Sequence, residues 1–302
     1  MKTLFYKGIK KVYYGVEAFF FLIFYGFFAL LPMRWASFLG GKIFSFIGPK
    51  TRLQQRCLTN LRRAFPEKTD RDLSGIAFDM WDNLGRTVGE FPHIHTLIRK
   101  KGVLELEGVH LIDMLKNDGM PGFFFSAHLA NWEISSLVAL SRGLPLLLIY
   151  RAANNPYVNF IVQRHRTKAP LVSYTPKGKE SAREALKVLR QGGHVGMLVD
   201  QKMGNGLPLS FFNQEAWTAP ALAQLALKFK APIVPAHVIR LKGVHFKIIY
   251  EEPFFVTETG NSEHDIKIAM IKVNKILERW IRENPGQWLW VHNRWGKGGI
   301  SS

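Results

Sequence analysis

His128 and Glu133 are two side chains whose types and spacing could perform acid–base chemistry. They begin and end the run His-Leu-Ala-Asn-Trp-Glu, which separates an apolar segment at 122–126 from a helical pattern. On one continuous helix a five-residue step sets two side chains about 140° apart. The pair can therefore meet only if His128 lies in a turn and Glu133 in the first turn of the helix. Glu133 would then hold one ring nitrogen, and the other could take a proton from a hydroxyl group. A purely structural histidine is the alternative interpretation.

Alternating apolar patterns on either side of this run predict the elements that must position it. Continuous apolar runs, which are typical of buried strands, occur at 144–150 and 195–199, and a short apolar strand is predicted at 122–126. Further strands are predicted at 103–107, 233–239 and 246–250. Helical patterns occur between and around them, at 70–90, 132–140, 156–166, 180–191, 220–230 and 265–283. This order predicts an α/β fold with a mostly buried sheet flanked by helices. We find no internal repeat or linker, so we expect one domain at 33–302, preceded by a separate segment at 1–32.

The first 32 residues are typical of a membrane anchor. Residues 12–31 contain Glu17 as their only charged side chain, and six phenylalanines fall within 18–31. About 20 apolar residues cross the hydrocarbon layer of a bilayer, so this segment reaches the spanning length but could also lie shallowly. Leu-Pro-Met-Arg at 31–34 offers no small-residue cleavage site, which favours a retained anchor over a signal peptide. A buried core helix is the alternative.

The charge balance predicts a polyanionic partner. Lys and Arg total 41 against 23 Asp and Glu, a formal net charge of +18. Nucleic acid and an anionic membrane surface both fit such a charge. The sequence lacks a recognisable nucleic-acid recognition motif, so we expect the membrane and no nucleic acid; a membrane-tethered nucleic-acid binder is the alternative of another class. We expect a basic collar on lipid headgroups, formed by Lys50, Arg52, Arg56, Arg62 and Arg63.

Several kinds of reactive centre lack their sequence signals. Cys57 is the only cysteine, which excludes a multi-thiolate metal site and an intramolecular disulfide. His-Glu-x-x-His and Cys-x-x-Cys motifs are missing, so we expect no metal and no other cofactor. Gly-x-Ser-x-Gly is also missing, which argues against a serine hydrolase.

The motif around His128 resembles the first motif of the lipid A late acyltransferases, bacterial membrane enzymes of the lysophospholipid acyltransferase superfamily. Tyr150-Arg151 with Asn154-Asn155-Pro156 and Arg166 is similar to the second block of that family, and Asp200-Gln201 to the third. Residues 287–295, Gln-Trp-Leu-Trp-Val-His-Asn-Arg-Trp, are similar to its C-terminal signature. Members commonly carry glycine at the position of Ala130.

The resemblance implies transfer of a fatty acyl chain to a hydroxyl of a lipid A precursor. The donor would be acyl carrier protein or coenzyme A carrying the chain as a thioester. The active site would face the cytoplasm from the bacterial inner membrane. His128 would act as general base, oriented by Glu133. Main-chain amides at the start of the helix near Asn131, or the guanidinium of Arg166, would stabilise the negative charge on the thioester oxygen; the residues do not decide between them.

Candidate substrate-binding residues lie in the motifs and just after predicted strands. Guanidinium groups grip phosphates bidentately, which suits Arg151, Arg164 and Arg166 to a phosphorylated acceptor. Asn131 and Asp200 complete this predicted set, although aspartate at a strand end more often caps or braces than reacts. Other acceptors remain open alternatives within the same fold: a lysophospholipid, an ornithine lipid or a phosphoinositide mannoside.

Overall fold

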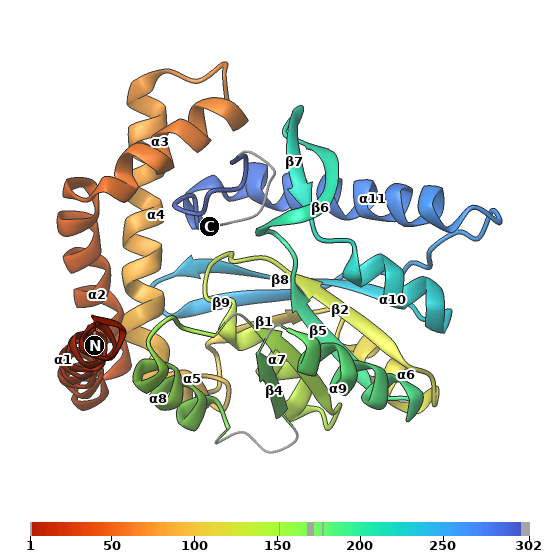
Figure 1. The fold of residues 1–302 in the computed structure, drawn as a ribbon, viewed down its shortest axis with the longest axis horizontal. Coiled ribbons are helices and arrows are strands. Elements are labelled where there is room, and N and C mark those ends of the chain that lie inside the picture. Colours follow the sequence, from red (N-terminus) through yellow and green to blue (C-terminus); the bar gives the residue numbers. More distant parts are fainter. Residues whose placement is uncertain (1, 151, 168–171, 177, 297–302) are drawn as a thin grey trace.

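A seven-stranded, mostly parallel sheet forms the centre of the molecule (Figure 1). The computed structural model describes residues 2–150, 152–167, 172–176 and 178–296, with side chains except at residues 2–9, 172 and 179. All neighbouring strands run parallel except β8 and β9. From edge to edge the strands are β1 (Leu104–Glu107), β9 (His245–Tyr250), β8 (Ile233–Lys242), β2 (Gly122–Ser126), β5 (His194–Leu198), β3 (Leu146–Tyr150) and β4 (Val172–Pro176).

Helices cover both faces of this sheet because its central strands are apolar on both sides. Phe123 and Phe125 of β2 belong to one buried cluster, together with residues of α10 (Ala221–Phe229) and α11 (Ser262–Glu283). Phe124 points to the opposite face, as the alternation of side chains along a strand requires, and packs with α6 (His110–Asn117) and α7 (Glu133–Ser141). The remaining helices near the sheet are α5 (Ile94–Leu97), α8 (Pro156–Arg166) and α9 (Lys179–Arg190). A separate hairpin consists of β6 (Lys202–Phe211) and β7 (Gln214–Thr218).

Four helices at the N-terminal end form an arm beside the sheet (Figure 1). They are α1 (Lys2–Leu30), α2 (Met33–Ile47), α3 (Arg52–Ala64) and α4 (Asp70–Glu90). The part of α1 from residue 10 to residue 30 is long and apolar enough to cross a membrane, and only 11% of its most apolar stretch is buried. Among the described residues it is the one helix that meets this description.

Contacts with α8 engage two polar side chains of α1, those of Glu17 and Tyr25. Glu17, the charged residue within the apolar stretch, accepts a hydrogen bond from Asn155 Nδ2 at 3.0 Å. Asn155 also caps the start of α8 through its side-chain oxygen. Further along, Tyr25 Oη lies 2.9 Å from His165 Nδ1. α8 therefore lies against α1.

The sequence predicts the α/β class and most of the elements correctly. The six predicted strands correspond to β1, β2, β3, β5, β8 and β9, with ends that differ by at most three residues. Among the elements that pattern analysis misses are β4, β6, β7, α5 and α6. Polar residues, glycines and a proline interrupt β6, so only its pairing with β7 reveals it as a strand. The division into an anchor at 1–32 and a domain at 33–302 stays a prediction.

Candidate active site

His128 lies in the loop between β2 and α7, where the register of the sheet sets its neighbours. Ser126 of β2 pairs with Leu198 of β5 in a parallel ladder. His128 and Asp200 each lie two residues beyond this pair. Both residues therefore lie at the carboxyl ends of their strands, at the same edge of the sheet. Crevices at the carboxyl ends of parallel strands are the usual binding sites of α/β folds.

Asp200 holds His128 through two hydrogen bonds. Its Oδ1 lies 2.8 Å from Nδ1 of the imidazole, and its Oδ2 accepts from the main-chain N–H of His128 at 2.9 Å. An ionised carboxylate only accepts hydrogen bonds, so Nδ1 of a neutral His128 carries the proton and Nε2 keeps its lone pair. Gln201 Nε2 lies 3.4 Å from that second nitrogen, and the side chain of His128 retains 16% exposure.

Asp200 itself is buried and ionised. Its side chain is 2% exposed, and Oδ2 also accepts from the indole N–H of Trp288 at 2.8 Å. Burial alone would raise the pKa of Asp200, but attraction to His128 and the hydrogen bonds from His128 and Trp288 lower it to about 2. The carboxylate can therefore fix the tautomer of the imidazole and stabilise its protonated form.

The C-terminal segment runs along the His128 loop and holds it through main-chain contacts. Leu289 N–H donates to the carbonyl of His128 at 3.1 Å, and Trp288 forms an antiparallel bridge with Leu129. His292 Nε2 accepts from the main-chain N–H of Lys202 at 3.0 Å. Trp288, Trp290 and Trp295 are at most 7% exposed, so they pack in the core.

Glu133 binds Arg166 in the structure. Its Oε2 accepts from Arg166 Nε at 3.0 Å, and a second bond joins Oε1 to Nη2, which makes a bidentate pair. Burial works against the charge of Arg166, but Glu133 outweighs it, and the pKa of Arg166 is raised. The rings of Tyr150 and Tyr174 lie 5.5 and 5.4 Å from the guanidinium carbon, within cation–π distance.

An apolar pocket opens beside this ion pair, between the sheet and α7. Glu133 and Arg166 line it together with Trp132, and the aliphatic part comes mainly from β3 and β5. Its other lining residues include Phe124, Ser135, Ala139, Leu146, Leu148, Ile149, Gly196, Met197, Leu198 and Tyr250. The lining is thus apolar apart from the ion pair and a few hydroxyl groups.

Comparison with known proteins identifies the family. The sequence model of the bacterial lipid A biosynthesis acyltransferases matches residues 5–297, almost the whole chain. The chain belongs to this family. A lipid A biosynthesis acyltransferase of Haemophilus influenzae is 25% identical over 308 residues, which cover 94% of this chain and 88% of the relative. A lipid A biosynthesis palmitoleoyltransferase of Escherichia coli is 21% identical over 270 residues, 87% of this chain and 86% of the relative.

The protein is thus an acyltransferase, and the structure corrects two predicted contacts in its site. The carboxylate on Nδ1 of His128 belongs to Asp200, not to Glu133. Residue spacing shows whether two side chains can meet, but not whether a third group from a neighbouring strand lies closer. Asp200 is predicted to bind substrate, yet it is enclosed and fully engaged by His128 and Trp288.

The other predicted binding residues of the acyltransferase lie in different surroundings. Asn131 is fully buried and donates to Glu90 Oε2 at 2.8 Å, so its side chain does not face an opening. Arg166 lines the pocket, and Arg164 is exposed on α8. Arg151 lies outside the described residues. The sequence does not predict that Trp288 is a partner of Asp200. The signal that could have indicated it is the position of Trp288 within the segment 287–295, which is similar to the C-terminal signature of the family.

Proposed function

We propose that this acyltransferase moves a fatty acyl chain from the thioester of acyl carrier protein to a hydroxyl of a lipid A precursor. The observation that carries the proposal is His128, held through Nδ1 by a buried, ionised Asp200 and left with Nε2 as a base. The apolar pocket, which Trp132 and Glu133 help to line, supports a long-chain acyl substrate. The names of the relatives support lipid A as the acceptor.

The reaction follows from these groups. Nε2 of His128 takes the proton of the acceptor hydroxyl as its oxygen attacks the thioester carbon, a step to which a positioned base contributes about 10²- to 10⁴-fold. Asp200 stabilises the imidazolium that forms. The carbon–sulfur bond then breaks, and the imidazolium returns its proton to the leaving thiolate. The acyl chain ends on the acceptor oxygen as an ester.

Two sources could stabilise the negative charge on the thioester oxygen. Asn131 and Trp132 directly precede α7, and Glu133 is its first residue. Among the described residues no hydrogen-bond acceptor engages the main-chain N–H groups of these three residues. The guanidinium of Arg166 is the other source, although Glu133 already binds it. We favour the amides because their N–H groups need no partner to be displaced.

Glu133 and Arg166 fit a role at the pocket in this proposal. The bidentate pair joins α7 to α8 across the pocket, and their side chains are only 10% and 16% exposed. Removing one partner would leave a mostly buried charge unpaired, which is costly. The pair therefore keeps the walls of the pocket together. Arg164, exposed on the same helix beside α1, would contact a phosphate of the acceptor.

We also propose that the site works at the cytoplasmic surface of the bacterial inner membrane. Together with α1, helix α2 exposes large apolar side chains on its outer surface, among them Trp35, Phe38 and Phe46. The basic collar continues from there, and each of its members is exposed: Lys50, Arg52, Arg56, Arg62 and Arg63. Apolar contact with lipid and attraction to anionic headgroups would act together.

The test is an assay of the full-length chain in detergent micelles, with products identified by mass spectrometry. Donors are acyl carrier protein thioesters and acyl-coenzyme A; acceptors are a lipid A precursor, a lysophospholipid, an ornithine lipid and a phosphoinositide mannoside. We expect acylation of the lipid A precursor from the carrier-protein thioester. His128→Ala should lower the rate at least about 10²-fold. The matched control is His264→Ala, which removes an exposed histidine at the start of α11.

Each other outcome has a clear reading. Acylation of another lipid, but not of the lipid A precursor, would reject the proposed acceptor. Undiminished transfer by a folded His128→Ala variant would reject the mechanism. Transfer from acyl-coenzyme A alone would reject the proposed donor, and salt-sensitive DNA binding without any transfer would favour a nucleic-acid binder.

A further inference from the structure

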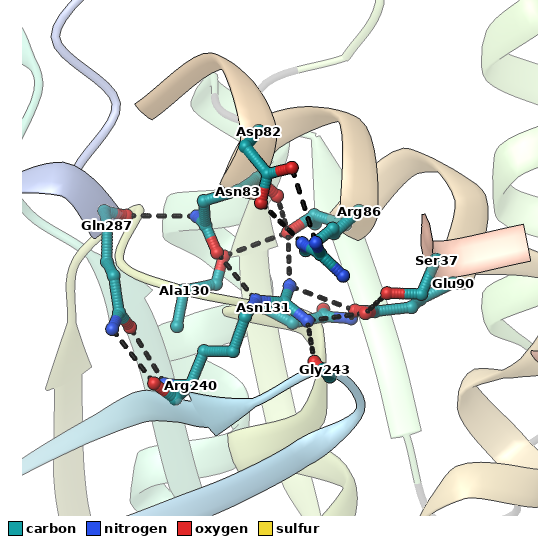
Figure 2. A network of polar contacts seen from close by, with 11 residues as sticks. Ser37, Asp82, Asn83, Arg86, Glu90, Ala130, Asn131, Arg240, Gly243 and Gln287 are labelled. Carbon is teal, nitrogen blue, oxygen red and sulfur yellow. Dashed lines mark hydrogen bonds and ion pairs between the residues drawn. The ribbon is translucent and has the colours of Figure 1, made fainter. Parts of the chain in front are cut away.

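A buried ion pair lies directly behind the active-site loop of residues 127–132 (Figure 2). Glu90, at the end of α4, is fully buried, and Arg240 of β8 is 9% exposed. Arg240 Nη2 donates to Glu90 Oε2 at 3.1 Å, and Nη1 donates to Oε1. Enclosing two charges carries a desolvation cost that their attraction barely offsets, so a buried pair is weak evidence for a role in stability alone.

Both members of the pair are fixed by rigid parts of the fold. Glu90 Oε1 also accepts from Ser37 Oγ of α2 at 2.7 Å. α2 and α4 touch through their backbones: a side chain at Gly89 would lie 2.2 Å from the carbonyl of Ala36. Arg240 donates through Nε to Asn83 Oδ1 at 2.8 Å and through Nη1 to the carbonyl of Gly243 at 2.8 Å.

The same cluster holds the loop at two consecutive residues. Asn131 Nδ2 donates to Glu90 Oε2 at 2.8 Å. The carbonyl of Ala130 accepts from Thr87 Oγ1 at 3.0 Å and from Asn83 Nδ2 at 3.2 Å, while its N–H donates to the carbonyl of Gln287 at 3.0 Å. Figure 2 shows Ala130 and Asn131 beside Asn83 and Glu90 of α4, with Gln287 bound to Asn83 and to Arg240.

Ala130 has a backbone conformation that needs such support. Its φ is +49°, in the left-handed region that a residue with a Cβ adopts at an energetic cost. Strained residues of this kind persist only where the surroundings fix them, and they concentrate at functional sites. Ala130 separates His128 from the main-chain amides of residues 131–133. Its conformation therefore sets the position of the base relative to those amides.

We propose that Glu90 and Arg240 are positioning residues for the acyl transfer. Through Asn131 and Ala130 they hold the loop in the strained conformation that places His128 and the start of α7 around the reacting carbon. The inference rests on the proposed function, because it gives the loop a catalytic task. Neither residue touches substrate. A displacement of about 1 Å in such a site can cost as much as 10²-fold in rate.

The test compares two variants of the cluster with a remote one. Asn131→Ala removes a single donor from Glu90 and leaves the ion pair, and Glu90→Gln removes the charge with little change of shape. Asp265→Asn is the control: Asp265 is a buried carboxylate in the first turn of α11 that accepts two hydrogen bonds from Thr259. For each we measure kcat, both KM values and the melting temperature, using the donor and acceptor that the wild-type chain uses.

We expect Asn131→Ala to lower kcat about tenfold or more while both KM values change less than about twofold. Asp265→Asn should lower the melting temperature and leave kcat within about twofold of wild type. Because Glu90→Gln leaves Arg240 charged and could fail to fold, Asn131→Ala decides the outcome. A folded Asn131→Ala variant with wild-type kcat would overturn the proposal. A loss of kcat no larger than that of Asp265→Asn, in two variants that melt at the same temperature, would also overturn it. His128→Ala, measured alongside, reports separately on the proposed function.

Discussion

Asp200 Oδ1 lies 2.8 Å from His128 Nδ1, although 72 residues separate the two in the chain. The parallel pairing of β2 with β5 brings them together, because both residues follow their strands by the same number of positions. Trp288 encloses the carboxylate and donates to its second oxygen. The geometry makes Asp200 the orienting partner of the proposed base.

The first prediction concerns that partner. Asp200→Asn should lower kcat by about 10²- to 10⁴-fold, the contribution of the base, because an amide can donate to Nδ1 and so place the ring proton on Nε2, where it blocks the base. Steady-state kinetics of the purified variant measures the effect, with circular dichroism as a control for folding. A loss of less than about tenfold in the folded variant would show that His128 does not depend on Asp200.

The second prediction concerns acid stability. The pKa of Asp200 is lowered to about 2 in the folded chain, below the value of about 3.9 for an unfolded aspartate. A depressed carboxyl pKa stabilises the fold above pH 4, and this stabilisation is lost as the pH falls from about 4 through about 2. Urea unfolding between pH 6 and pH 3 should thus show a steeper loss of unfolding free energy in wild type than in Asp200→Asn. Equal dependence of the unfolding free energy on pH in the two proteins would contradict this prediction.

The third prediction separates Glu133 from the base. If Glu133 acts through its ion pair with Arg166, Glu133→Gln and Arg166→Gln should each lower kcat/KM, and the double variant should be no worse than the more severe single one. A double-mutant cycle measures this coupling. Losses that multiply would mean that the two side chains act independently, and would reopen a direct role for Glu133 at His128.

The fourth prediction tests the pocket. Ala139 lines it from α7, so Ala139→Leu places three further carbons inside the space. Each methylene that no longer fits forfeits about 0.8 kcal/mol of burial, so the preferred acyl chain should shorten by about two to four carbons. Competition among thioesters of different length measures the shift. Ala185→Leu adds the same volume to the buried core outside the pocket and should lower stability without changing the preference. An unchanged preference in Ala139→Leu would exclude the pocket as the acyl site.

The fifth prediction concerns the basic collar. A triple variant, Lys50→Glu, Arg52→Glu and Arg56→Glu, should lose the preference for acceptor presented in anionic over zwitterionic vesicles, since each charge near an anionic surface contributes about 1 kcal/mol. The same change of charge at Lys228, Lys267 and Lys275, which are exposed on α10 and α11, is the control. If both triple variants lost this preference equally, the net charge of the protein, and not the position of the collar, would account for it.

Local patterns predict the helices that bury one apolar face and the strands that are apolar throughout. The runs at 122–126 and 156–166 coincide with β2 and α8 because their ends carry clear local signals, a polar turn and an Asn-Pro start. β6 and β7 are not predicted because neither strand buries a continuous apolar face. Each is defined by its hydrogen bonds to the other. The motif likewise locates His128 but does not identify its carboxylate.

The sequence by itself determined the α/β class, an apolar helix at the N-terminus, the excess of positive charge and the histidine at the end of β2. The charge is a sum over all residues in any order, and the other features depend on residues that are neighbours in the chain. The tertiary structure alone decided which acid binds His128, which side chain Glu133 holds, and how Glu90 and Arg240, 150 residues apart, come to lie behind the loop. Such contacts depend on the order and register of strands, which a chain acquires only when distant segments pack together.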